Sequence, residues 1–282
     1  MELVEPKKTV IVCPTLACNC RCWYCYQAHT PVHMKEATIV ATENFLAKNI
    51  FQLNYGEWFW LEFFGGEPML CMDTILRIAN SVRNNCINNS IFFLGSITTN
   101  GTLLNKNTLQ QLENVCVSHL QITIDGTPDF HDRQRYLCNG KGTWEQIWKG
   151  LLSILESSFR CNVIIRVHYR IEYLQEAVQL IKKYINPTFS GDSRFSIVFQ
   201  EIKALNLLNS DNQFKIYSTR ERQRALAILN DAVLYSNMVS NLNVSEYMCY
   251  ATKPSSIVIM PDGSLAKCTV SFKEIGKLDI GI

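Results

Sequence analysis

The chain has 282 residues, of which 47% are hydrophobic and 18% are charged, and its formal net charge is +2. This balance is typical of a globular protein with one large domain, or one large and one small, and it argues against a general nucleic-acid or membrane-surface role. No segment reaches the ~18 apolar residues that span a bilayer, and the first residues lack the apolar core of a signal peptide. Twelve cysteines without a secretion signal indicate a reducing cytoplasm and metal binding rather than disulfides.

Strand and helix patterns alternate along the chain, which favours an α/β fold with a parallel sheet. Short β-branched or apolar runs predict six strands, at residues 9–13, 58–64, 91–97, 119–124, 163–169 and 195–202. Helical spacing of apolar residues predicts helices within 36–54, 72–82, 105–112, 143–155, 174–185 and 218–233. Two of them open with expected capping boxes, Thr143 with Gln146 and Ser218 with Glu221. Six strand–helix units are too few for a closed eight-unit barrel and predict a partial (β/α)6 barrel of the TIM type.

A cysteine-rich loop follows the first predicted strand. Cys18, Cys22 and Cys25 have C-x3-C-x2-C spacing. A [4Fe–4S] cluster is usually held by four cysteines, so three thiolates from one loop leave one iron open to a non-protein ligand. Three nearby cysteines also suit half of a zinc site or buried thiols, and Cys20 offers other ligand choices. The cysteines scattered elsewhere are expected to be core thiols: Cys71, Cys86, Cys116, Cys138 and Cys161.

Polar or glycine residues also follow the next three predicted strands. Ligands of parallel α/β folds gather at the C-terminal ends of the strands, so we expect one shared site at one rim. Glycines let a backbone approach a ligand closely, and Glu67 offers an acceptor for an ammonium group. In isolation each motif is also an ordinary turn. The motifs are Gly65-Gly66-Glu67-Pro68, Thr99-Asn100-Gly101 and Asp125-Gly126.

The order of these motifs resembles that of radical S-adenosylmethionine (radical SAM) enzymes of the SPASM-containing branch, which includes peptide maturases and anaerobic sulfatase-maturing enzymes. The resemblance extends over roughly residues 8–200 and includes the segments 99–102, 123–126 and 131–135. It implies a [4Fe–4S] cluster on Cys18, Cys22 and Cys25, whose open iron chelates the amino and carboxylate groups of S-adenosylmethionine.

The resemblance implies further cofactor contacts. Tyr24 would lie against the adenine, and Thr123 and Arg135 would contact the ribose or the methionine carboxylate. A planar guanidinium suits a carboxylate, although Arg135 also fits a surface loop. The expected cofactor-binding set is completed by Gly65, Gly66, Glu67, Pro68 and Asn100. The sequence identifies no catalytic residue.

The tail of the chain resembles the opening of a SPASM segment. Cys249, Gly263 and Cys268 fit its pattern, which implies the first half of an auxiliary [4Fe–4S] site; two unrelated thiols beside a hairpin are the alternative. Asp262 and Gly263 predict the turn of that hairpin, between 256–260 and 265–268. We expect three parts: the barrel (1–202), a linker with a bridging helix (203–245) and an incomplete SPASM or twitch-like segment (246–282).

Two departures from the family pattern bear on the function. The chain ends at Ile282, before the later cysteines of the pattern, so it is a truncated piece, lacks the auxiliary cluster or completes it differently. Thr269 follows Cys268, where sulfatase maturases resemble one another in placing an Asp that acts as a base. This difference favours a peptide modification other than sulfatase maturation.

The implied reaction is reductive cleavage of S-adenosylmethionine to a 5′-deoxyadenosyl radical, which abstracts hydrogen from a ribosomally made peptide or a protein side chain. We expect a cytoplasmic maturase that forms a crosslink or thioether and receives electrons from a donor such as flavodoxin or ferredoxin. Two alternatives stay open. One is a non-catalytic iron–sulfur or zinc protein, and the other is a radical SAM enzyme acting on a small molecule or nucleic acid.

Overall fold

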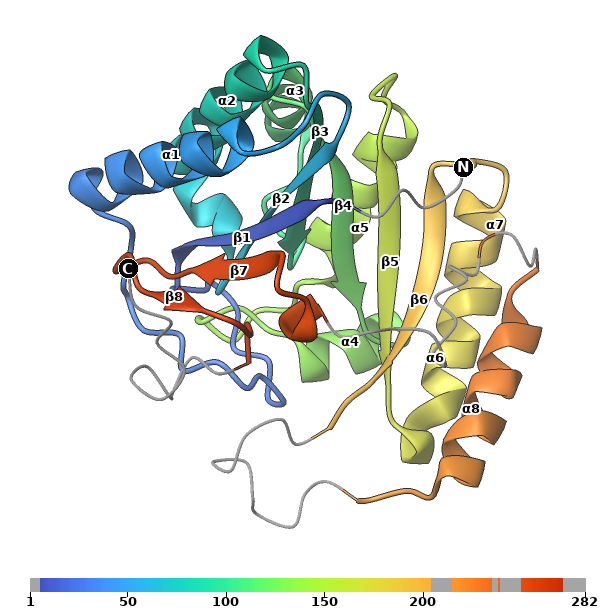
Figure 1. Cartoon of the computed structure of the whole chain (residues 1–282). Coiled ribbons are helices and arrows are strands. Elements are labelled where there is room, and N and C mark those ends of the chain that lie inside the picture. The colour runs from blue at the N-terminus through green and yellow to red at the C-terminus, as the bar shows by residue number, and fades with distance from the viewer. Residues whose placement is uncertain (1–5, 204–214, 235–237, 239–249, 271–282) are drawn as a thin grey trace.

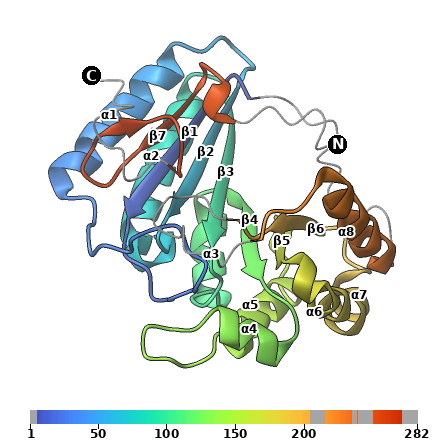
Figure 2. The same ribbon diagram turned by 90° about the horizontal axis from the view of Figure 1, so that it is seen from below.

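A computed structural model describes residues 6–203, 215–234, 238 and 250–270. Its strands form one sheet in the order β6-β5-β4-β3-β2-β1-β7-β8 (Figure 1). The first six strands run parallel and form the predicted partial barrel, whose curvature is visible in Figure 2. All six strands were predicted, with no boundary wrong by more than two residues. They are β1 (Lys8–Thr15), β2 (Trp58–Gly65), β3 (Phe92–Thr99), β4 (Val117–Ile124), β5 (Asn162–Tyr169) and β6 (Phe195–Glu201).

The helices cover the convex face of the sheet (Figure 2). They are α1 (Glu36–Phe51), α2 (Met72–Asn88), α3 (Lys106–Asn114), α4 (Pro128–Gln134), α5 (Trp144–Leu155), α6 (Leu174–Leu180), α7 (Asn186–Phe189) and α8 (Thr219–Ala232). The apolar period over 174–185 is confirmed, but the backbone changes to a π-helix at Ile181–Ile185. α4 lies in a segment predicted as a polar loop, because its seven residues carry no apolar period. In the described part of the chain, no helix is long and apolar enough to cross a membrane.

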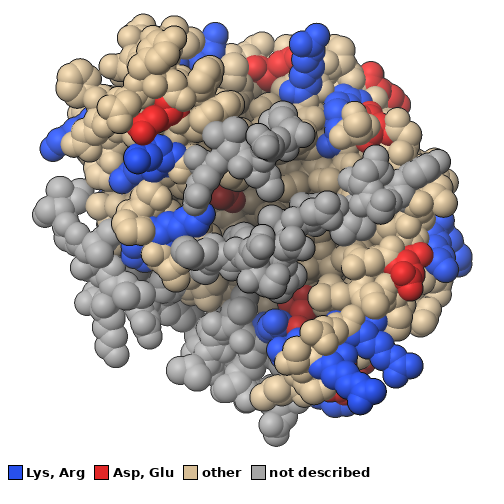
Figure 3. Space-filling model, turned by 45° about the vertical axis from the view of Figure 1, so that its right-hand side comes forward, with Lys and Arg blue, Asp and Glu red and all other residues tan. Residues whose placement is uncertain are grey.

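Each strand of the barrel presents different side chains to its two faces. On β1, Val10 and Val12 join the main core beneath the helices, whereas Ile11 and Cys13 belong to a separate cluster. Other residues of the helix-covered face, such as Leu61 on β2, are fully buried. Both basic and acidic side chains lie on the face shown in Figure 3.

The C-terminal hairpin extends the barrel sheet. β7 (Ser256–Ile259) pairs in parallel with β1, and β8 (Leu265–Ala266) pairs antiparallel with β7. Asp262 and Gly263 form the turn, as predicted, and Gly263 has a φ of +91°. The hairpin thus continues the barrel sheet beside β1, and its Val258 and Met260 pack into one buried cluster with Ile11. Of the expected linker and bridging helix, residues 204–214, 235–237 and 239–245 lie outside the described residues, as do 246–249 and 271–282 of the expected auxiliary segment.

The two predicted capping boxes have opposite outcomes. At α8, Ser218 and Glu221 bond each other's backbone N–H groups, which confirms the capping box. At α5 the prediction is wrong, because the Thr143 side chain makes no cap hydrogen bond. Asp132 Oδ1 instead accepts from the backbone N–H groups of Thr143 and Trp144, each at 2.8 Å. The Thr143 hydroxyl is hydrogen-bonded to His131 and to the Arg135 carbonyl instead.

Candidate functional site

The loop after β2 is bonded to the chain that enters the cysteine loop. The N–H of Gly66 donates to Thr15 O at 3.1 Å, and that of Glu67 donates to Ala17 O at 2.8 Å. A Cβ on Gly65 would lie 2.2 Å from Thr15 O, and one on Gly66 would lie 2.1 Å from Ala17 O. Both glycines are therefore required by a close approach of two backbones. The Gly66 N–H is bonded within the protein, and the expectation that the backbone of these glycines approaches a ligand stays a prediction.

Glu67 joins the loop after β2 to the loop after β3. Its carboxylate is fully buried; Oε1 accepts from Thr99 Oγ1 at 2.7 Å and from Met69 N at 3.0 Å, and Oε2 accepts from Asn100 N at 2.7 Å. Burial raises the pKa of Glu67 to about 7, although these hydrogen bonds oppose the increase. Pro68 follows as the first residue of a short 3₁₀ helix. A carboxylate expected to meet an ammonium is thus bonded to its own chain.

Asn100 lies against the cysteine loop. Its Nδ2 donates to Asn19 Oδ1 at 2.8 Å and lies 3.3 Å from Cys20 Sγ and 3.7 Å from Cys18 Sγ. The N–H of Cys20 also donates to Cys18 Sγ, at 3.4 Å. Hydrogen bonding with the Cys20 side chain is the main cause that lowers the pKa of Cys18 to about 6, and the bonds from the Cys20 backbone and Asn100 add to it, while burial opposes it. A lower pKa favours the thiolate, which is the form that binds metals.

The three candidate cluster ligands are half-buried in one loop. Burial raises the pKa of both Cys22 and Cys25, and the Arg135 guanidinium opposes that increase. Cys25 Sγ lies 3.1 Å from His29 Nε2. Within the described ranges, no three His, Cys, Asp or Glu side chains are grouped to hold a single metal ion. A cubane cluster makes a different demand, because each of its cysteine thiolates binds a different iron atom.

A network of buried polar side chains lies at the ends of β4 and β5. The Tyr24 hydroxyl donates to Asp125 Oδ2 at 2.5 Å, accepts from Arg135 Nη1 at 2.7 Å and lies 3.0 Å from His168 Nδ1. Burial raises the pKa of Asp125 to about 6, and the positive charge of Arg135 opposes this shift. Burial lowers the pKa of His168, which favours its neutral ring. One phenol thus connects a carboxylate, a guanidinium and an imidazole.

Two buried atoms of this network have no hydrogen-bond partner among the described residues, Asp125 Oδ1 and Arg135 Nε. His168 Nδ1 is 3.6 Å from Asp125 Oδ1, beyond hydrogen-bond distance. A buried donor or acceptor left unsatisfied costs about 1–3 kcal/mol. Because one atom accepts and the other donates, the pair fits a ligand that carries both hydroxyl and carboxylate groups.

Several predicted site residues do meet at this edge: the cysteine loop, the loops after β2 and β3, Tyr24 and Arg135. Thr123 is buried near the end of β4, but its side chain makes no hydrogen bond to the described residues. Asp125 belongs to a motif expected at the shared site but was given no ligand of its own, and His168 is not predicted. The signal for His168 is a histidine near the C-terminal end of an apolar strand, where a ligand site is expected.

The other cysteines correct part of the sequence-based interpretation. Cys86 and Cys161 are buried, as expected of core thiols, and Cys71 is half-buried. Cys116 and Cys138 are exposed, so the prediction is wrong for both. Cys116 lies in the tight turn between α3 and β4 with a φ of +58°, and Cys138 lies in the loop between α4 and α5.

Of the two expected auxiliary ligands, Cys249 lies outside the described residues. Cys268 follows β8 and is half-buried, and its Sγ accepts from the N–H of Val270 at 3.4 Å. The hydroxyl of the next residue, Thr269, lies 2.7 Å from the hydroxyl of Tyr250. The auxiliary site therefore remains a prediction.

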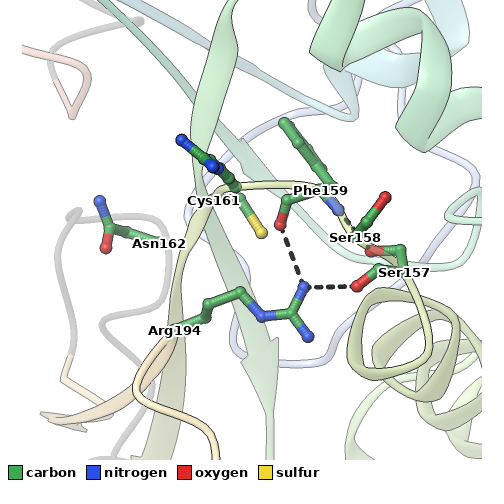
Figure 4. Close-up of a pocket in the computed structure, with 7 residues that line it drawn as sticks. Ser157, Ser158, Phe159, Cys161, Asn162 and Arg194 are labelled. Carbon is green, nitrogen blue, oxygen red and sulfur yellow. Dashed lines mark hydrogen bonds between the residues drawn. The ribbon is translucent and has the colours of Figure 1, made fainter.

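A surface pocket of about 400 Å³ lies at the opposite, amino end of β5 (Figure 4). Arg194 Nη1 donates to the carbonyls of Ser157 and Phe159 at 2.9 and 3.0 Å, and Nη2 donates to Leu155 O at 2.9 Å. Asp192 neutralises the guanidinium at 2.6 Å. These bonds stabilise the C-terminal end of α5 and the turn into β5, so this pocket belongs to the framework.

The family model for the radical SAM superfamily matches residues 12–187, more than half of the chain. The chain belongs to the radical SAM superfamily. Members of this superfamily use a [4Fe–4S] cluster and S-adenosylmethionine, and the protein is a radical SAM enzyme.

The chain is similar to three further proteins. It is 25% identical over 253 residues to an uncharacterised protein of Methanocaldococcus jannaschii, with 87% of this chain and 84% of that protein covered. It resembles the structure of anSMEcpe with bound AdoMet and Kp18Cys peptide, with a TM-score of 0.75 and 17% identity over 97% of this chain and 76% of that one. It also resembles Streptococcus suis SuiB bound to precursor peptide SuiA, with a TM-score of 0.63 and 17% identity over 98% of this chain and 62% of that one. These structural similarities establish a shared fold.

Proposed function

We propose that this radical SAM enzyme modifies a peptide or protein side chain, forming a crosslink or thioether. The observation that carries the cofactor assignment is the meeting of the cysteine loop, the diglycine turn and the Tyr24–Asp125–Arg135 network at one edge of the partial barrel. The peptide substrate is supported by fold similarity to two proteins whose structures contain bound peptides. When bound, the reduced cluster and S-adenosylmethionine supply a 5′-deoxyadenosyl radical that abstracts a hydrogen atom.

We assign the cluster to Cys18, Cys22 and Cys25. The donors near Cys18 Sγ, from the Cys20 backbone and the Asn100 side chain, stabilise the thiolate. Hydrogen bonds to cluster sulfurs also influence the reduction potential. Electrons would come from a donor such as flavodoxin or ferredoxin.

We assign the binding of S-adenosylmethionine to the β4–β5 side of the edge. Arg135 Nε is an unused donor for the methionine carboxylate, and Asp125 Oδ1 is an unused acceptor for a ribose hydroxyl. Tyr24 and Thr123 would complete this side of the site. Gly65, Gly66, Glu67 and Pro68 act through the geometry of the loops that they join, as their hydrogen bonds and close contacts support.

We retain the division into a barrel, a linker with bridging helix and an auxiliary segment as a proposal. In it, Cys268 and Cys249 supply thiolates to an auxiliary [4Fe–4S] cluster. A variant lacking both thiols should lose iron beyond that of the first cluster. An iron content unchanged by the double replacement would refute this auxiliary site.

The cofactor assignment is tested by anaerobic iron–sulfur reconstitution, followed by addition of reductant and S-adenosylmethionine. We expect the release of methionine and 5′-deoxyadenosine. Replacing Cys18, Cys22 and Cys25 together by Ala should abolish the cleavage and remove the iron and absorbance of the first cluster, while those of an auxiliary cluster on Cys249 and Cys268 would be retained. Iron uptake without cofactor cleavage in the intact protein would instead indicate an electron carrier.

The substrate class needs a separate test. A peptide encoded beside this gene is incubated with the reconstituted enzyme and examined by mass spectrometry. A crosslink or thioether would lower its mass by two hydrogens and join two residues that fragment as one unit. Cofactor cleavage coupled to modification of a small molecule or nucleic acid, with peptides unchanged, would refute the peptide assignment and leave the cofactor assignment intact.

A further inference from the structure

A ring of hydrogen bonds closes the segment between β4 and α5. The N–H of Asp125 donates to His131 Nδ1 at 3.0 Å, His131 Nε2 lies 3.0 Å from Thr143 Oγ1, and Thr143 Oγ1 donates to Arg135 O at 2.8 Å. The bonds of Arg135 and Asp125 to the Tyr24 hydroxyl complete the ring. The cofactor assignment above uses Arg135, Asp125 and Tyr24, but it gives no role to His131 or Thr143.

The backbone N–H of Asp125 fixes which atom donates and which accepts in the bonds of His131 and Thr143. Because His131 Nδ1 accepts from a backbone N–H, the neutral ring carries its hydrogen on Nε2 and donates it to the Thr143 hydroxyl. That hydroxyl then donates its own hydrogen to the carbonyl of Arg135. A single tautomer therefore satisfies every member of the chain. Burial, which lowers the pKa of His131, is consistent with this neutral form.

The Thr143 side chain makes these bonds instead of capping α5. A threonine before a helix usually caps its first N–H groups, yet here Asp132 accepts from those groups and the Thr143 hydroxyl turns to His131 and Arg135. His131 and Thr143 are both completely buried. A local preference overridden in this way is expected at functional sites.

We propose that His131 and Thr143 are positioning residues for the S-adenosylmethionine site. They tie the backbone of Asp125 to the backbone of Arg135, the two residues whose side chains keep an unused acceptor and an unused donor. The inference rests on the proposed assignment of those two side chains to the cofactor. Through the backbone, the imidazole and the hydroxyl hold both at a constant separation, so the cofactor meets a preformed pair.

The test measures binding of S-adenosylmethionine to the reconstituted enzyme without reductant, by isothermal titration calorimetry, so that no cleavage occurs. Thr143→Val keeps the shape of the side chain but removes both hydrogen bonds, and it should raise Kd about tenfold. Thr143→Ser keeps the hydroxyl and should stay within about twofold of the wild type. His131→Asn should weaken binding as Thr143→Val does, and the double variant should be no worse than either single one because the two act as one unit.

His119→Asn is the matched control, because His119 lies on β4 away from the site and contacts Asn162 at 2.9 Å. Its Kd should equal that of the wild type. The melting temperature of every variant is recorded in parallel. If Thr143→Val lowers the melting temperature but leaves Kd equal to that of Thr143→Ser, the pair has only a structural role and the proposal fails. Should Thr143→Val not fold, His131→Asn carries the same comparison.

Arg135→Lys distinguishes the positioning role of His131 and Thr143 from the proposed contact of Arg135 with the cofactor. If Arg135→Lys leaves Kd unchanged, the assignment of Arg135 to the cofactor is wrong. If Arg135→Lys weakens binding while Thr143→Val and His131→Asn do not, only the positioning role is wrong.

Discussion

Two buried charged regions at the same edge of the sheet differ in how they are satisfied. On the β2–β3 side, Glu67 accepts three hydrogen bonds, from Met69, Thr99 and Asn100. On the β4–β5 side, Asp125 and Arg135 bond to a shared phenol, yet each keeps one buried atom without a hydrogen-bond partner among the described residues. Buried polar groups are nearly always satisfied. The Glu67 carboxylate is therefore satisfied within the described chain, whereas Asp125 and Arg135 keep the acceptor and the donor that we propose bind the cofactor.

This difference separates two kinds of mutational effect. Changes on the Glu67 side should lower the free energy of unfolding, because they break contacts that hold three loops together. Changes on the Arg135 side should chiefly weaken cofactor binding.

Gly66→Ala should have the largest effect. The new Cβ would lie 2.1 Å from Ala17 O and 2.6 Å from Leu16 O, which are backbone atoms. We expect a loss of about 4 kcal/mol in the free energy of unfolding, or no folded protein, as measured by urea denaturation. Gly191→Ala is the control, because a Cβ there meets nothing within 4 Å. Equal stability of the two variants would contradict the close-approach argument.

Glu67→Ala should lower the free energy of unfolding by about 3 kcal/mol, because it leaves two backbone N–H groups and the Thr99 hydroxyl without their buried acceptor. Denaturation by urea measures the change. Glu145→Ala, which removes an exposed carboxylate paired with Lys149, should alter stability little. If the two glutamate variants are equally stable, Glu67 does not hold the loops together.

Asp125 should make stability depend on pH. Because burial raises its pKa from 3.8 to about 6 in the folded protein, the folded state binds the proton more tightly than the unfolded state. The stabilisation that comes from protonating Asp125 is fully present below pH 3.8 and is lost as the pH rises to about 6. The free energy of unfolding should fall by roughly 3 kcal/mol over this range. Asp125→Asn should make the slope shallower in urea denaturation across that window, leaving the part that comes from Glu67, whose pKa is also raised. A constant difference between the two proteins at every pH would disprove the shift.

Arg135→Lys should raise the Kd for S-adenosylmethionine about 30-fold, or about 2 kcal/mol, because lysine keeps the charge but lacks Nε and the planar fork. The free energy of unfolding should change less than in Glu67→Ala. Titration calorimetry and urea denaturation provide the two measurements. A variant that unfolds easily but binds normally would reverse the proposed comparison.

Ser218→Ala should have the smallest effect. It removes the cap of α8, which lies away from both sides of the site, and should lower the free energy of unfolding by about 1 kcal/mol. Cofactor affinity should be unchanged, as checked by the same titration. An altered affinity would show that the binding measurement responds to general destabilisation.

Local sequence signals determined most of the framework. Apolar β-branched runs specify strands buried on both faces, and this explains why all six barrel strands were predicted. Parallel strands put their C-terminal ends at one edge, so the order of the motifs was enough to bring Cys18, Gly66 and Asn100 together. The capping box at Ser218 was also predicted from the sequence, because all of its partners lie within four residues.

The partners of the buried polar groups in the site depend on contacts between segments that are distant in the sequence. The predicted capping box at Thr143 was wrong because the Thr143 hydroxyl bonds to His131 and to the Arg135 carbonyl instead. Both residues precede α5 and lie outside the local pattern that predicts a cap. Two of the three partners of Glu67, Thr99 and Asn100, lie at the end of β3 and directly after it. β7 joins the sheet at β1 through a pairing that no local period encodes. Periodicity reports which face of an element is buried, whereas the partner of a buried polar atom depends on segments that meet only when the chain has folded.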